Sequence, residues 1–392
     1  METVSHRIAA LAESQTMAMN QKTRDLQAKG VNVINMTVGE PDFNTPDHIK
    51  EAAKKAIDEN YSFYSPNPGY PELIQAIVGK FKRENGLDYS PAQIIVSNGA
   101  KHSLANVMMS VINKGDEIIL PAPYWVSYYE LVRLAEGTNV VLDTTVESNW
   151  KITPAQLEKA ITPKTKALIL CSPSNPTGSV YTQSEMEALA KVLDKYPQIY
   201  VIADEIYEHI RYQGEHRLLA TLPGMRERTV TISGLSKTFS CTGWRLGYAI
   251  APAEITSAIR KVHDFLTVGA PAPLQEAAAV GLRLPADYYS SLASDYRERR
   301  DLLCSALSRC GFRFSSPEGA YYVLADYSQL SDLEDRDFAI WLAREGGVAT
   351  VPGSSFYATP GGGRRSVRFA FCKRLETLQA AVQRWERLPS LV

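Results

Sequence analysis

The chain has 392 residues, of which 45% are hydrophobic and 22% charged, as is ordinary for a globular enzyme. Its 42 basic residues nearly balance its 43 acidic ones, which gives no reason to expect nucleic acid or an anionic membrane as a partner. Five scattered cysteines without zinc spacing, and no run near the roughly 20 apolar residues of a membrane span, predict a cytoplasmic protein with no metal site and no membrane contact.

The first 45 residues have no sheet pattern of their own, and we expect them to pack with the end of the chain. From about residue 90 to 255, short apolar strands alternate with stretches long enough for a helix. The predicted strands are Ile94–Val96, Glu117–Leu120, Asn139–Asp143, Ala167–Cys171, Ile199–Ala203, Thr229–Ser233 and Gly247–Ala251. Near-continuous apolar strands with long connections predict an α/β fold, with a mainly parallel seven-stranded sheet between helices.

After Pro285 the pattern changes to a long charged helix followed by three short strands and a further helix. This part reads as a smaller α+β unit. We therefore expect a large domain from residues 46–284 and a small domain from residues 1–45 and 285–392.

In open α/β sheets, ligands bind beyond the carboxyl ends of the strands. The strand at 94–96 leads into Asn98–Ser103, where small residues open a helix whose free N–H groups suit a phosphate. A glycine-rich turn alone is weak evidence. The next strand leads to Trp125, which could stack on a flat ring, although packing is the common role of a single tryptophan.

The two strands that follow end in an amide and an acid. Asn175 lies in an Asn-Pro turn, and Asp204 comes directly after five apolar residues. A carboxylate there can pair with a protonated pyridine nitrogen and keep such a ring cationic, while Tyr207 and Asn175 could bond a ring oxygen. The alternatives are a plain turn for Asn175 and a helix cap for Asp204.

The strand at 229–233 runs into Gly-Leu-Ser-Lys-Thr-Phe-Ser, which contains Ser236 and Lys237. A lysine just past a buried strand is costly to bury unless it has a partner or a function. Desolvation and nearby positive charge, such as that of Arg245, would lower its pKa and make the amine nucleophilic. The alternative is a surface lysine in a Gly/Ser-rich loop.

Five strand ends thus carry a phosphate-type turn, an aromatic platform, an amide, an acid and a lysine. Residues 236–247 resemble the SKxxxxTGWRxG stretch of class I, fold type I aminotransferases, which depend on pyridoxal phosphate (PLP). The likeness covers essentially the whole chain and is greatest to the bacterial aspartate aminotransferase subgroup. Its other matches are Gly39–Phe43, Tyr64-x-Pro66-x-x-Gly69, Val351–Gly353 and Arg368.

The resemblance implies that Lys237 holds PLP as a Schiff base and shuttles the proton, with Asp204 and Tyr207 as the other catalytic residues. The implied cofactor site comprises Tyr64 of the partner subunit, Ala100, Lys101, Trp125, Asn175, Asp204, Tyr207, Ser236, Lys237 and Arg245. The implied substrate site comprises Gly39, Trp125, Asn175 and Arg368, with Ser14, Thr16 and Lys101 near a distal carboxylate. The Ala122–Pro123 and Asn175–Pro176 bonds are expected to be cis, as in the family.

The implied activity is ping-pong transfer of an amino group from an L-amino acid, with aspartate as the preferred expectation, to a 2-oxo acid such as 2-oxoglutarate. The implied assembly is a homodimer with shared active sites. An aromatic or methionine-type aminotransferase and a carbon–sulfur lyase on the same fold remain open. A regulatory aminotransferase-like protein is disfavoured, because no basic helix-turn-helix segment precedes the fold. Ala12 stands where relatives that use prephenate tend to carry lysine, which argues against prephenate.

Overall fold

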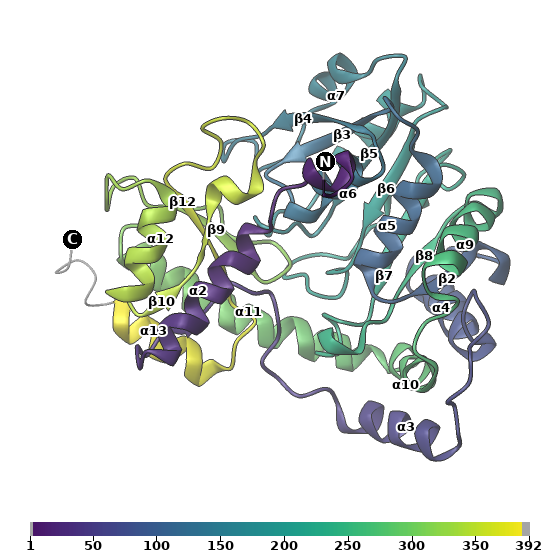
Figure 1. Ribbon diagram of the computed structural model, residues 1–392, viewed down its shortest axis with the longest axis horizontal. Coiled ribbons are helices and arrows are strands. Elements are labelled where there is room, and N and C mark those ends of the chain that lie inside the picture. The colour runs from purple at the N-terminus through teal and green to yellow at the C-terminus, as the bar shows by residue number, and fades with distance from the viewer. Residues whose placement is uncertain (1–2, 386–392) are drawn as a thin grey trace.

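The computed structural model describes residues 3–385, and its largest sheet has seven strands (Figure 1). Its strand order is β2-β8-β7-β6-β5-β3-β4. The strands are β2 (Ile94–Ser97), β3 (Glu117–Ala122), β4 (Thr138–Asp143), β5 (Thr165–Cys171), β6 (Tyr200–Asp204), β7 (Thr229–Gly234) and β8 (Gly247–Ile250). Only β8 runs antiparallel to its neighbours, so the predicted mainly parallel sheet is confirmed.

Helices cover both faces of this sheet, which explains why its strands are apolar throughout rather than alternating. Ile169 and Ile202 pack into one hydrophobic cluster, whereas their neighbours Leu168 and Val201 pack into another. Successive strand residues point to opposite faces, so both faces are buried. The helices of this part are α3 (Asp47–Asp58), α4 (Pro71–Asn85), α5 (Ala100–Val111), α6 (Val126–Leu134), α7 (Pro154–Ala160), α8 (Gln183–Leu193), α9 (Ala253–Thr267) and α10 (Ala272–Leu282).

The two ends of the chain gather beside the large sheet, where purple α2 lies next to the yellow-green C-terminal elements (Figure 1). A three-stranded antiparallel sheet has the order β11-β12-β9, and β1 pairs in parallel with β10. These strands are β1 (Ile34–Asn35), β9 (Tyr322–Asp326), β10 (Val348–Ala349), β11 (Val351–Pro352) and β12 (Ser366–Ala370). The two-residue β1 was not predicted, because a strand that short has no periodicity.

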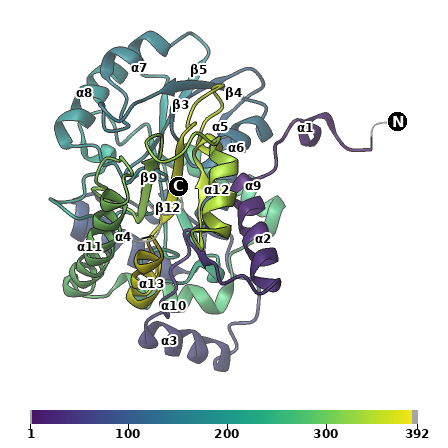
Figure 2. The ribbon, with the colours of Figure 1, turned by 90° about the vertical axis from the view of Figure 1, so that its left-hand side faces the viewer.

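Four longer helices and one short one complete this part. They are α1 (His6–Ala9), α2 (Gln15–Ala28), α11 (Ala286–Arg309), α12 (Asp335–Arg344) and α13 (Leu375–Trp385). Figure 2 shows α1 at the edge of the molecule, where it contacts α6. Among residues 3–385, no helix combines the length and apolar character needed to cross a membrane.

Candidate active site

One cavity of about 280 Å³ lies where the parallel strands end, and it gathers nearly every predicted site residue. Its lining includes Ser14, Thr16, Gly39, Ala100, Lys101, Trp125, Asn175, Asp204, Tyr207, Ser236, Lys237, Arg245 and Arg368. The exception is Tyr64, which does not line the cavity and is 87% exposed. Residues from both chain ends and from five strand ends therefore meet at one place.

Lys237 enters this cavity from the turn after the fully buried strand β7. Its Nζ donates a hydrogen bond of 2.8 Å to the carbonyl oxygen of Gly39. The pKa of Lys237 is lowered to about 8, mainly by burial; Cys372 and Glu40 oppose this fall, and the charges of Arg245 and Arg368 contribute to it. A lysine with this pKa has a substantial neutral, nucleophilic fraction near neutral pH.

Asp204 is the last residue of β6, and its side chain is buried. Oδ2 accepts a hydrogen bond of 2.5 Å from the Tyr128 hydroxyl, and Oδ1 accepts one of 3.2 Å from the backbone N–H of Ile206. Burial raises the pKa of Asp204 to about 6, and the two hydrogen bonds oppose that rise. The bond to Ile206 resembles the cap alternative, but no α-helix begins here.

Arg368, on β12, is also buried and stacks between two aromatic rings. Its guanidinium carbon lies 4.6 Å from the ring centroid of Tyr322 and 4.9 Å from that of Phe356. Nη1 donates to Asn175 Oδ1 at 2.8 Å, and Nη2 donates to the carbonyl oxygen of Thr37. Its Nε is buried and has no partner among the described residues, so a donor remains for an anionic ligand.

The start of α5 forms a tight backbone cradle. Gly99, with φ +88°, precedes Ala100, and a Cβ on Gly99 would lie 2.4 Å from Nη2 of Arg245. A Cβ on Gly247 would lie 2.4 Å from the backbone nitrogen of Ala100. Glycine at both positions lets the helix N-terminus and Arg245 come together, and N–H groups of a first helical turn beside a guanidinium favour a phosphate.

A family model of class I and II aminotransferases matches residues 31–384. This chain belongs to that family. It is 41% identical to an aspartate aminotransferase of Pinus pinaster, over 98% of this chain and 80% of the pine protein. It is also 41% identical to an aspartate/prephenate aminotransferase of Cereibacter sphaeroides, over 98% of each chain. The aspartate aminotransferase of Thermus thermophilus, solved with maleate, superposes with a TM-score of 0.92 at 39% identity, covering 99% of this chain and all of the other.

The protein is therefore an aminotransferase of fold type I, as the sequence predicted. The residues of the cavity also fit the cofactor that such enzymes use. PLP carries an aldehyde, a ring nitrogen and a phosphate, and the cavity offers an amine of lowered pKa, a buried carboxylate and a helix N-terminus with an arginine. The predicted cis bonds before Pro123 and Pro176 are confirmed, and the bond before Pro173 is cis as well.

Sequence reasoning missed two tyrosines that contact the predicted aminotransferase residues. Tyr128 donates to Asp204, and the hydroxyl of Tyr322 lies 2.9 Å from that of Tyr207. Each sits inside an apolar pattern, Tyr128 on a helix face and Tyr322 in a strand, where a tyrosine looks like core. The available signal for Tyr128 was its spacing of three residues from Trp125, which places both on one side of a helix.

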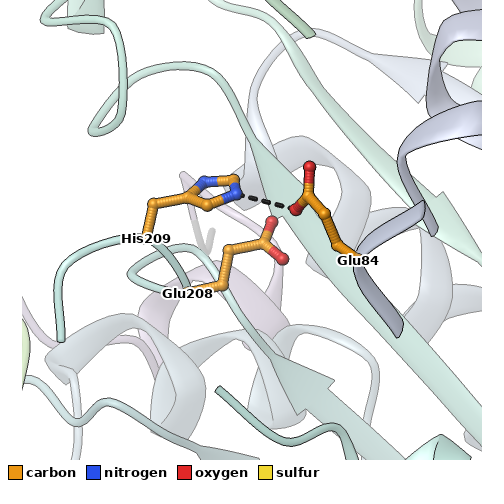
Figure 3. A group of neighbouring side chains, drawn as sticks. All are labelled: Glu84, Glu208 and His209. Carbon is orange, nitrogen blue, oxygen red and sulfur yellow. Dashed lines mark hydrogen bonds and ion pairs between the residues drawn. The ribbon is translucent and has the colours of Figure 1, made fainter. Parts of the chain in front are cut away.

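A second charged group lies outside the lining of the aminotransferase cavity: Glu84, Glu208 and His209 bring their ligand-type atoms within 4.8 Å of one another (Figure 3). The ammonium group of Lys80 already contacts Glu208 and lies 3.6 Å from Glu84. His209 Nε2 lies 3.0 Å from Glu84 Oε2. We interpret the group as a partly buried ion-pair network in which Lys80 supplies the cation; the absence of a metal stays a prediction.

Proposed function

We propose that this aminotransferase binds PLP through Lys237 and transfers the amino group of L-aspartate to a 2-oxo acid such as 2-oxoglutarate. The observation that carries the proposal is that one cavity holds three cationic side chains besides Lys237, namely Lys101, Arg245 and Arg368. A cofactor phosphate and a substrate α-carboxylate occupy two of them. The third, Lys101, remains for a second carboxylate, which a dicarboxylic amino acid carries.

The roles that we propose follow the geometry. Arg245, Ser236 and the N–H groups at Ala100 and Lys101 hold the phosphate, together with Tyr64 of the partner subunit. Asp204 accepts from the ring nitrogen, Tyr207 and Asn175 bond the ring oxygen, and Trp125 stacks on the ring. When bound, PLP supplies an electron-accepting ring that stabilises negative charge at the substrate α-carbon.

The chain's own groups do the remaining work. Arg368, held by Thr37 and Asn175, fixes the α-carboxylate beside Gly39. The fixed carboxylate orients the α-hydrogen, and Lys237 Nζ accepts this proton and returns it, as general base and then general acid. The carbonyl oxygen of Gly39 holds the amine in place. Both half-reactions use the same site, so the first oxo acid must leave before the second one binds, and this order gives ping-pong kinetics.

The choice of aspartate rests on Lys101, with Ser14 and Thr16 nearby in the cavity lining. Nζ of Lys101 lies 4.9 Å from the ring centroid of Trp125, and partial burial, followed by the charge of Arg245, lowers its pKa. The Thermus relative was solved with maleate, itself a four-carbon dicarboxylate. An aromatic or methionine-type donor would make no use of this cation, and the exposed Ala12 offers no charge for prephenate.

A panel of half-reactions tests this choice. Purified protein loaded with PLP is mixed with aspartate, glutamate, phenylalanine, methionine or alanine, and the visible absorbance of the cofactor is followed. We expect aspartate to react fastest. Lys101→Met should lower kcat/KM for aspartate by about tenfold or more, as expected for loss of one charged hydrogen bond. The same variant should leave alanine nearly unaffected; an equal loss for both amino acids would contradict the assignment of Lys101.

We also propose the division into a large domain of residues 46–284 and a small domain of residues 1–45 and 285–392, supported by their separate sheets. A homodimer is supported by strongly exposed aromatic residues, among them Phe63, Tyr64 and Phe265. A cytoplasmic location agrees with the absence of any disulfide within residues 3–385, which include all five cysteines.

A further inference from the structure

Tyr128 has no role in the site described so far, yet it makes the shortest side-chain contact to Asp204. It lies in the first turn of α6 and is 2% exposed. Its hydroxyl donates to Oδ2 of Asp204 at 2.5 Å. Its ring meets that of Trp125 edge to face, with centroids 5.3 Å apart. One turn of helix therefore carries both the aromatic platform and a donor to the carboxylate.

The carboxylate of Asp204 needs such a donor, because burial favours its neutral, protonated form. The groups that face it from the packed elements are Tyr128 on α6, Cys171 on β5, Glu205 and Tyr207 in the turn after β6, and Lys237 after β7. Glu205 is itself bound to His216 at 2.9 Å, and burial raises the pKa of the Cys171 thiol, which stays neutral. Among the described residues, Tyr128 is the side chain that donates to Asp204.

Tyr128 remains a donor over the whole working range of pH. Burial, and then the negative charge of Asp204, hold the pKa of its phenol well above the ordinary value of 10. A hydrogen bond to a charged acceptor is stronger than a neutral one and favours the charged form of that acceptor. The bond also occupies one oxygen of Asp204, while the backbone N–H of Ile206 occupies the other, so the plane of the carboxylate is fixed.

We propose that Tyr128 is a positioning residue for Asp204, whose hydroxyl keeps this carboxylate ionised and oriented toward the ring nitrogen of the cofactor. The inference rests on the proposed function, since it presupposes that Asp204 pairs with that nitrogen. Tyr128 itself touches neither substrate nor cofactor in this role. It acts through Asp204 alone, and its effect must therefore depend on the ring nitrogen.

Equilibrium binding to the apoprotein separates this role from a merely structural one. The variant is Tyr128→Phe, which removes the hydroxyl and keeps the shape of the ring. The probes are PLP and its 1-deaza analogue, in which a C–H group replaces the ring nitrogen. We expect the variant to bind PLP about tenfold more weakly at pH 7, from the loss of one charge-assisted hydrogen bond. Binding of the analogue should be unchanged.

The loss of PLP affinity in Tyr128→Phe should also grow as the pH falls from 8 to 6, because Asp204 without its donor takes up a proton at higher pH. Tyr129→Phe is the matched control, because Tyr129 lies on the same helix and stacks on Tyr124. This variant should bind both probes as the wild type does. In an Asp204→Asn background, adding Tyr128→Phe should cost nothing further, because the two residues act as one unit.

The possible results have distinct meanings. Equal weakening for PLP and the analogue would show a structural role and overturn the proposal, and so would wild-type affinity of Tyr128→Phe for PLP. A wild-type protein that binds PLP without forming a link to Lys237 would instead overturn the proposed function. Should Tyr128→Phe fail to fold, 3-fluorotyrosine at position 128 keeps the hydroxyl and makes it a stronger donor; PLP affinity at pH 6 must then rise relative to that of the analogue.

Discussion

Lys237 shows how a single residue acquires reactivity from its surroundings. In water its amine would be almost wholly protonated at neutral pH, and a protonated amine cannot attack an aldehyde. Burial at the end of β7 favours the neutral form, and the charges of Arg245 and Arg368 add to this effect. The cations that we assign to phosphate and carboxylate binding therefore also help to activate the amine.

The pH dependence of cofactor capture follows from this. In the apoprotein the pKa of Lys237 is about 8, below its ordinary value of 10.5, so the neutral fraction rises with pH and levels off above pH 8. The rate of reaction with added PLP should rise by up to about tenfold per pH unit between pH 6 and 8 and then become flat. Stopped-flow absorbance measures the rate, and borohydride reduction followed by mass spectrometry locates the modified lysine.

A rate that continued to rise to pH 10 would show an ordinary lysine and contradict the lowered pKa. Lys237→Ala is the necessary control. It should show no covalent capture at any pH, while PLP still binds reversibly through the phosphate cradle. Label on another lysine of the wild-type protein would contradict the assignment of Lys237 itself.

The residues that the sequence alone could identify share one property: polar groups stand where an apolar strand ends. Lys237, Asp204 and Asn175 were predicted because a buried strand runs directly into each of them. Tyr128 and Tyr322 were not, because a phenol inside an apolar pattern serves equally well as core. Only the fold reveals which polar atom each hydroxyl meets.

At the scale of one element, the turn after β6 divides its side chains between two environments. Asp204 and Tyr207 line the cavity. Glu208 points instead to the buried Lys80 on α4 and accepts a hydrogen bond from Ser233 on β7 at 2.7 Å. His209 lies 3.2 Å from the hydroxyl of Thr238, the residue after Lys237. The network of Figure 3 therefore connects the turn after β6 to β7 and to the loop that carries Lys237.

Most strands and helices of the large domain were predicted from the sequence, because the spacing of apolar residues along each element reflects which of its faces is buried. The network behind the turn was not predicted. Lys80 occupies an inward position of α4, and a lysine in a helix reads as a solvent-exposed residue unless its partner is known. That partner, Glu208, is 128 positions away in sequence, and no local pattern connects the two.

Removing Lys80 tests how much this network stabilises the fold. Lys80→Met leaves the carboxylate of Glu208 buried without its cation, and the free energy of unfolding at pH 7 should fall by about 3–5 kcal/mol. Lys80→Met combined with Glu208→Gln should recover much of that loss, because no charge is then left unpaired. Urea denaturation of the apoprotein measures both. Lys82→Met, from an exposed lysine on the same helix, is the control and should change little.

The same ion pair has a pH signature. Burial raises the pKa of Glu208, but the charge of Lys80 outweighs it, and the pKa falls from its ordinary 4.5 to about 2. A carboxyl with a lowered pKa stabilises the folded state above pH 4.5 and loses that contribution as the pH falls toward 2. Wild-type stability should thus fall more steeply below pH 4.5 than that of the double variant. Parallel curves would contradict the assigned pair.

At the scale of the whole molecule, the loop between α3 and α4 lies beside the end of α9, and both carry exposed aromatic residues. Phe63 in this loop is 80% exposed and Phe265 in the last turn of α9 is 90% exposed; Asn67 joins the two segments by hydrogen bonds to Asp264 and to the carbonyl oxygen of Val268. Large apolar side chains exposed to this extent on neighbouring segments favour an interaction site. Tyr64 stands in the same loop and does not line its own chain's cavity, so a homodimer is required if it is to bind a phosphate.

Mixing two defective variants decides whether the active sites are shared. Tyr64→Ala removes a phosphate contact and Lys237→Ala removes the amine, so each homodimer is impaired. In a heterodimer of the two, one site combines Lys237 of the first chain with Tyr64 of the second and is complete. Subunit exchange should therefore raise activity well above the mean of the separate variants, toward one wild-type site per heterodimer.

If Tyr64 served its own chain, the heterodimer would hold one site without Lys237 and one without Tyr64, and mixing would gain nothing. Phe265→Glu supplies the independent test of the interface, because a carboxylate in an apolar contact is costly to desolvate. Light scattering should show this variant as a monomer or a much weaker dimer. A wild-type chain that stays monomeric at micromolar concentration while fully active would contradict the shared site, because one copy leaves Tyr64 outside the cavity.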